Sequence, residues 1–130
     1  MATAFIKIAA IYLLIGISLG IYMGIVEEFE YTPVHAHINL LGWATTGLFG
    51  VIYHVLPEAG NSKLGKAHFW LHNIGSFLVL FGMILFVNGE EGLAFPVALT
   101  GALAVVAATL VFIVNLFKNA KETQPRRRQE

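Results

Sequence analysis

The sequence predicts an all-α membrane protein with four transmembrane helices, on the evidence of its composition and its hydropathy pattern. Hydrophobic residues make up 57% of the 130 residues and charged residues only 12%, too few for the surface of a soluble domain of this size. Four apolar runs cover residues 3–26, 34–56, 67–87 and 93–117. Each is long enough to cross a hydrocarbon core about 30 Å thick as a helix. Four strands could not close a barrel, which leaves helices as the spanning structure.

The charges are divided between the two ends of the predicted bundle. Three glutamates lie in the first interhelical loop and two in the third, whereas all basic residues lie near the N-terminus, in the second loop or after the fourth run: Lys7, Lys63, Lys66, Lys118, Lys121, Arg126, Arg127 and Arg128. The positive-inside rule then places both termini in the cytoplasm, in a multi-pass protein of the cell inner membrane. We expect a transmembrane domain at 1–118 and a basic cytoplasmic tail at 119–130 that is a topology anchor and a disordered end; attraction to lipid headgroups is the alternative, and nucleic-acid binding is not expected.

The first run carries Gly16, Gly20 and Gly24, one small residue every four positions. This spacing favours close helix packing, and a flat cofactor lying in the groove is the alternative. No small-residue cleavage site follows the run, so we expect a retained helix rather than a signal peptide. Pro33 suits the first turn of the second helix.

The later boundaries follow from turn residues. The second helix is expected to end near Pro57, before a cytoplasmic turn at 58–62. The third begins near Lys66, and an outer turn at 88–92 leads into the fourth. The fourth run has no ionisable side chain before Lys118, which predicts a structural or lipid-facing wall.

The main functional signal is a set of five histidines on the second and third helices, because ionisable side chains at membrane depth are usually functional. Neutral imidazole is a ligand for haem iron, copper and zinc. His35 and His37 stand at the outer end of the second helix and point to nearly opposite faces, at about 100° per residue. They can therefore serve two different centres. The alternative is a pair of interfacial histidines that bond to the loop.

The other three histidines lie toward the cytoplasmic end. His54 follows His37 by about 25 Å along a helix axis, so it cannot complete the outer site within one chain. His68 and His72 share one face of the third helix. These three could form an inner haem, copper or zinc site, or they could be interfacial residues near the headgroups. The chain has no cysteine, which excludes disulfides, iron–sulfur clusters and covalent haem attachment.

Two stretches resemble subunit I of the haem–copper oxidases. Residues 34–43 (VHAHINLLGW) and 47–57 (GLFGVIYHVLP) resemble its tenth helix, with a His-x-His pair at the outer end and a Tyr and a Pro at the inner end. Residues 63–75 (KLGKAHFWLHNIG) are similar to the stretch that begins its eleventh helix. The His-Ala-His motif also resembles membrane proteins of the NnrS type, which are linked to nitric oxide.

The resemblance implies a role for each histidine. His35 matches the ligand of the high-spin, gas-reactive haem, and His37 matches a ligand of the low-spin haem. His68 matches a histidine that binds no metal in the oxidases, and neither His54 nor His72 has a ligand counterpart there. One chain lacks the further histidines and the cross-linked tyrosine of the copper site. It also lacks outer arginines for haem propionates, which would contact backbone N–H groups, Asn39, Trp43 or water instead.

The resemblance also implies an assembly. The oxidase subunit has three pseudo-equivalent groups of four helices, and this chain resembles one such group, so we expect a homo-oligomer, trimer first, with haem between subunits. The leading hypothesis is a non-covalent haem b protein for electron transfer or for binding of oxygen or nitric oxide, with a quinone or a cytochrome as electron donor. Oxidoreductase turnover at a complete haem–copper centre is less expected. The alternatives are a copper- or zinc-binding module and a structural subunit of a respiratory complex.

Overall fold

The computed structural model describes residues 1–120 and contains helices only in that part of the chain. Four of the described segments are long and apolar enough to cross a membrane, and they run over Ala2–Val26, Thr32–Val55, Lys63–Val87 and Glu91–Asn119. The four predicted spans are therefore confirmed, with ends within a few residues of those expected. The arginines of the predicted basic tail, at 126–128, lie outside the described residues.

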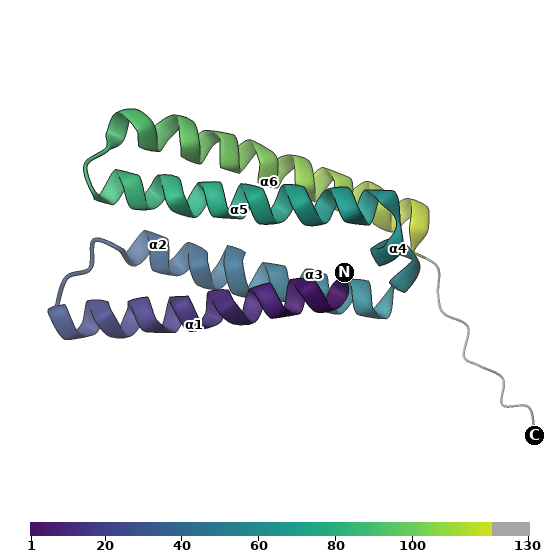
Figure 1. Cartoon of the computed structure of the whole chain (residues 1–130), viewed down its shortest axis with the longest axis horizontal. Coiled ribbons are helices and arrows are strands. Elements are labelled where there is room, and N and C mark those ends of the chain that lie inside the picture. The colour runs from purple at the N-terminus through teal and green to yellow at the C-terminus, as the bar shows by residue number, and fades with distance from the viewer. Residues whose placement is uncertain (121–130) are drawn as a thin grey trace, which may run out of the picture.

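The spans pack as two antiparallel hairpins (Figure 1). In one hairpin, α1 (Ala2–Val26) lies along a composite second span, and in the other, α5 (Lys63–Val87) lies along α6 (Glu91–Asn119). The N-terminus and the link between the hairpins lie at one end of the bundle, here called the inner end. The α1–α2 loop and the α5–α6 turn lie at the opposite, outer end.

The second span is not one continuous α-helix. It consists of α2 (Thr32–His37), the π-helix η1 (Ile38–Thr45) and α3 (Thr46–Val55). The turn expected at 58–62 is instead the short helix α4 (Pro57–Asn61), with Pro57 in its first turn. π-Helical segments are rare, and those that occur are frequently found at functional sites. The position of η1 directly after the histidine pair is therefore relevant to the site.

Local sequence signals set the helix ends. Pro33 lies in the first turn of α2, where its missing N–H costs no hydrogen bond. Ser62 caps α5, because its Oγ accepts the N–H of Gly65 at 2.9 Å. Gly89 adopts a φ of +84° in the outer turn, which suits a residue without a Cβ.

Small residues let α5 and α6 approach closely. A Cβ atom added to Gly82 would lie 2.6 Å from the backbone nitrogen of Ala98, and one added to Gly101 would lie 2.5 Å from that of Val79. This contact was not predicted from the sequence, where only the glycines of the first run were singled out. It makes the α5–α6 pair intolerant of larger residues.

We expect Gly101→Ala to lower the free energy of unfolding by about 1–3 kcal/mol, because the added methyl group meets the backbone of α5. Gly92→Ala in the same helix is the matched control, since a Cβ at that position has no neighbour within 4 Å. Unfolding of the two variants in detergent micelles measures the difference. Equal stabilities would show that the α5–α6 contact tolerates a Cβ.

Candidate functional site

His35 is held against α1 by the glycines of the first span. Its Nδ1 lies 2.9 Å from the carbonyl oxygen of Gly16, and a Cβ on Gly20 would lie 2.8 Å from its Cε1. Asn39 fills the space beside Gly16 and donates from Nδ2 to the carbonyl oxygen of His35 at 2.9 Å. Gly16 and Gly20 therefore make room for side chains of the second span. Helix packing accounts for these two glycines.

His37 points away from that contact and is exposed. Its Nδ1 lies 2.9 Å from the carbonyl oxygen of Pro33, one turn earlier in α2. Because a carbonyl oxygen only accepts hydrogen bonds, Nδ1 of both His35 and His37 carries the proton. Both neutral rings then present an unprotonated Nε2, which is the form that binds a metal. Anchoring of the distal nitrogen to a carbonyl is the usual support of a ligating histidine.

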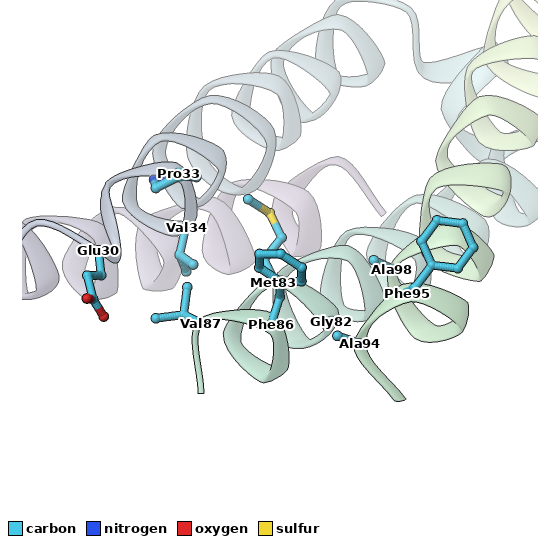
Figure 2. Close-up of a pocket in the computed structure, with 10 residues that line it drawn as sticks. All are labelled: Glu30, Pro33, Val34, Gly82, Met83, Phe86, Val87, Ala94, Phe95 and Ala98. Carbon is cyan, nitrogen blue, oxygen red and sulfur yellow. The ribbon is translucent and has the colours of Figure 1, made fainter. Parts of the chain in front are cut away.

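An apolar cleft of about 560 Å³ opens at the outer end, between α2 and the α5–α6 hairpin (Figure 2). Pro33 and Val34 form its α2 wall, and Met83 and Val87 of α5 lie across from them. Its remaining lining residues are Glu30, Gly82, Phe86, Ala94, Phe95 and Ala98. His37 is not a lining residue, but its ring is bonded to the carbonyl oxygen of Pro33, which forms part of the α2 wall. The volume falls in the range of small-molecule sites.

The inner histidines form a buried polar network instead. Nδ1 of His68 lies 2.8 Å from Oη of Tyr53, and Asn115 donates to the same Oη at 3.2 Å. Asn115 Oδ1 in turn accepts a hydrogen bond from Ser62 Oγ at 2.7 Å. Oη of Tyr53 accepts from Asn115 and has one proton to donate; when this proton goes to His68 Nδ1, the neutral ring carries its own proton on Nε2, a buried atom that has no hydrogen-bond partner among the described residues. This network joins α3, the α4–α5 junction and α6 at the inner end.

His72 has a separate partner. Its Nε2 lies 2.8 Å from Oγ1 of Thr46, and that hydroxyl donates to the carbonyl oxygen of Leu41 at 3.0 Å. Since the single hydroxyl proton is used, Nε2 of His72 must be the donor. The ring of Phe49 packs edge-on against His68 and His72, with centroid distances of 4.4 and 5.0 Å.

His54 is exposed on α3, whereas His68 and His72 are buried. Within residues 1–120, no three His, Cys, Asp or Glu side chains are grouped so that they could hold a metal ion. A single chain therefore does not bring His54, His68 and His72 together as the inner metal site considered from the sequence. His68 and His72 instead face partners on other helices.

Two residues of this arrangement, Thr46 and Asn115, were not singled out from the sequence. Both are fully buried, with an exposed fraction of 0%. Asn115 did leave a signal, because it is a polar side chain within the otherwise apolar fourth run. The partnership of Thr46 with His72 had none, because it depends on the π-helical register of η1.

The comparison with protein families decides what kind of chain this is. The family model described as "Cytochrome C and Quinol oxidase polypeptide I" matches residues 24–94, more than half of the chain. The chain belongs to this family. The matched region of the oxidase polypeptide I family contains all five histidines, from the end of α1 to the beginning of α6. The resemblance stated from the sequence is thereby confirmed, and the chain is a multi-pass membrane protein with four candidate spans. No solved structure matches it.

The hydrogen bonds predict two classes of histidine tautomer. We expect His35 and His37 to carry the proton on Nδ1, and His68 and His72 to carry it on Nε2, because of the acceptors and donors that face them. Nitrogen NMR of ¹⁵N-histidine-labelled, cofactor-free protein in micelles at neutral pH distinguishes the two forms. Single His→Gln variants assign the signals. Nε2–H tautomers at His35 and His37 would contradict the arrangement.

Proposed function

We propose that this chain binds a non-covalent b-type haem at its outer end, with His37 as an axial ligand, and that it serves electron transfer or the binding of oxygen or nitric oxide. The observation that carries the proposal is the exposed His37 ring, whose Nδ1 is fixed by the carbonyl of Pro33, a residue of the apolar cleft wall. Proteins of the oxidase polypeptide I family bind haem. The chain has no cysteine for covalent attachment.

The residues present fit such a group. The cleft walls are apolar apart from Glu30, and apolar walls suit the face of a porphyrin. The ring of His37 is already held through its Nδ1, the nitrogen that would not bind the iron. When bound, the haem would supply one-electron redox chemistry or a position for a diatomic gas. The chain's own contribution is the orientation of the imidazole and the exclusion of water from the cleft.

His35 is proposed as the ligand of a second centre on the α1 side. Its Nδ1 is bonded to Gly16, so its unprotonated Nε2 is directed along α1 near Gly20. The ring is only partly buried, and His37 faces away from it. A haem held by His35 alone would keep an open coordination position for a gas.

The polar groups around the outer end limit how haem propionates would be held. Asn39 is already committed to the carbonyl oxygen of His35, whereas Trp43 has an exposed fraction of 43%. The loops at this end carry glutamates and no lysine or arginine. We therefore propose Trp43, backbone N–H groups and water as propionate partners, in place of cations.

A partner chain would complete the site. A six-coordinate haem held by His37 needs a second axial ligand, and a haem with two histidine ligands needs a second histidine beside His37. We propose a homo-oligomer, trimer first, in which a neighbouring copy supplies that ligand at the interface. We further propose the cell inner membrane as its location, with the inner end of the bundle in the cytoplasm and a quinone or a cytochrome as the electron donor.

No observation favours the copper or zinc module. His68 and His72 are bonded to Tyr53 and Thr46, and His54 lies apart from them on an exposed surface. Elemental analysis of the purified protein tests whether copper binds as an additional ion at the outer site.

Purified protein is expected to show a Soret band and paired visible bands on reduction, and His37→Ala should abolish the low-spin bands because it removes the axial nitrogen. His54→Ala is the matched control, since that exposed histidine on the same span is outside the proposed site. A pyridine haemochrome assay with native mass gives haem type and copy number. A His37→Ala variant with an unchanged low-spin spectrum, or a haem-loaded monomer with two axial ligands, would exclude the assignment.

His35→Ala should remove any spectral shift caused by carbon monoxide while leaving the low-spin bands intact, because only the second centre has an open position. Carbon monoxide difference spectra of reduced protein make the measurement. Loss of both signals with the protein still folded would show that the two histidines share one centre.

A further inference from the structure

We propose that His72, acting through Thr46, is a positioning residue that holds the π-helical register of the second span and thereby aims the His35–His37 pair. This inference deepens the proposed function and rests on it for its meaning. The contacts that carry it lie wholly within the described part of the chain, and none of them involves a residue of the cleft.

The first step is a relay of two hydrogen bonds between α5 and η1. His72 Nε2 donates to Thr46 Oγ1 at 2.8 Å, and Thr46 Oγ1 donates to the carbonyl oxygen of Leu41 at 3.0 Å. Thr46 and His72 have exposed fractions of 0% and 2%. The hydrocarbon core of a bilayer holds no water that could replace a lost buried hydrogen bond. Loss of one partner of the relay therefore leaves the others unsatisfied.

The second step is the place of the relay on the helix. Leu41 lies inside η1, and Thr46 is the residue at which η1 gives way to α3. The hydroxyl of Thr46 thus reaches a carbonyl five residues earlier, across the widened turn. A hydroxyl that is itself held by His72 fixes this turn from the side of α5.

The third step is the rotation that the π-helix produces. In an ideal α-helix of 3.6 residues per turn, Tyr53 follows His35 by five whole turns and would lie on the same face. In this structure, His35 bonds to Gly16 of α1, whereas Tyr53 bonds to His68 of α5 and Asn115 of α6. The wider turns of η1 therefore let the side chain of His35 point to α1 while that of Tyr53 points to α5 and α6, although α1 packs along both halves of the span.

The consequence concerns the orientation of the two outer imidazoles. If the second span relaxed to a continuous α-helix while its inner half stayed in the Tyr53 network, α2 would rotate about the helix axis. His35 would leave the Gly16 carbonyl, and His37 would turn together with Pro33 and Val34, which line the cleft. His72 is thus coupled to both rings although it lies on another helix.

Two pairs of substitutions separate the relay from simple packing. Thr46→Val removes the hydroxyl but keeps the branched shape, and Thr46→Ser keeps the hydroxyl. His72→Leu removes the donor, and His72→Gln restores an N–H at a similar distance from the backbone. Size-exclusion chromatography in micelles identifies the folded fraction, on which all other measurements are made.

The first readout needs no cofactor. In the ¹⁵N spectrum of folded, cofactor-free protein, Thr46→Val and His72→Leu should shift the His35 Nδ1–H signal, whereas Thr46→Ser and His72→Gln should leave it near the parent position. An unchanged His35 signal in both disruptive variants overturns the inference. This arm holds even if the protein proves to bind no haem, which would refute the proposed function alone.

The second readout is haem affinity by titration. Loss of a residue that supports a ligating histidine typically lowers affinity by about 10- to 100-fold, and we expect Thr46→Val and His72→Leu to fall in that range. The conservative variants should stay within about twofold of the parent by the same reasoning. Equal affinities across all four variants, with haem bound through His37, would show that the relay is structural only.

Discussion

The structure depends on one constraint: a polar group inside a bilayer must find its hydrogen-bond partner within the protein. Four histidines meet this requirement at one ring nitrogen each, in two ways, whereas Nε2 of His68 is buried without a hydrogen-bond partner in the described part of the chain. At the outer end, backbone carbonyls engage Nδ1 of His35 and His37 and leave Nε2 as a lone pair. At the inner end, the hydroxyls of Tyr53 and Thr46 engage His68 and His72 on opposite ring nitrogens. The choice of partner decides the chemistry, because it fixes which imidazoles can bind a metal.

Local sequence patterns were sufficient for the four spans and their order. Apolar run lengths, Pro33 and the polar breaks depend on neighbouring residues only, so they could be predicted to within a few positions. The 3.6-residue spacing also held for the histidine pair, because His35 and His37 both lie in the α-helical segment that precedes η1. Beyond Ile38 the same rule fails. The π-helix changes which residues share a face of the span. Neither the composition of the segment nor the spacing of its residues predicts a π-helix there.

The hydrogen-bond partners of the inner histidines could not be predicted from the sequence for a related reason. Tyr53, His68 and Asn115 come from three helices, and only the packed bundle brings them together. Sequence reasoning could state that His68 and His72 share a face of α5, but not that the face turns inward. The family match over residues 24–94 includes both the outer pair and the inner histidines but not Asn115, and it does not give the contacts that these residues make.

The two hairpins are joined covalently only through α4, at the inner end, where the Ser62–Asn115–Tyr53–His68 network also ties them together. The cleft lies at the opposite end, open between α2 and the α5–α6 pair. A ligand that entered this cleft would therefore break no contact of the inner network. If a haem binds there as proposed, folding of the bundle and loading of the cofactor would be separable events.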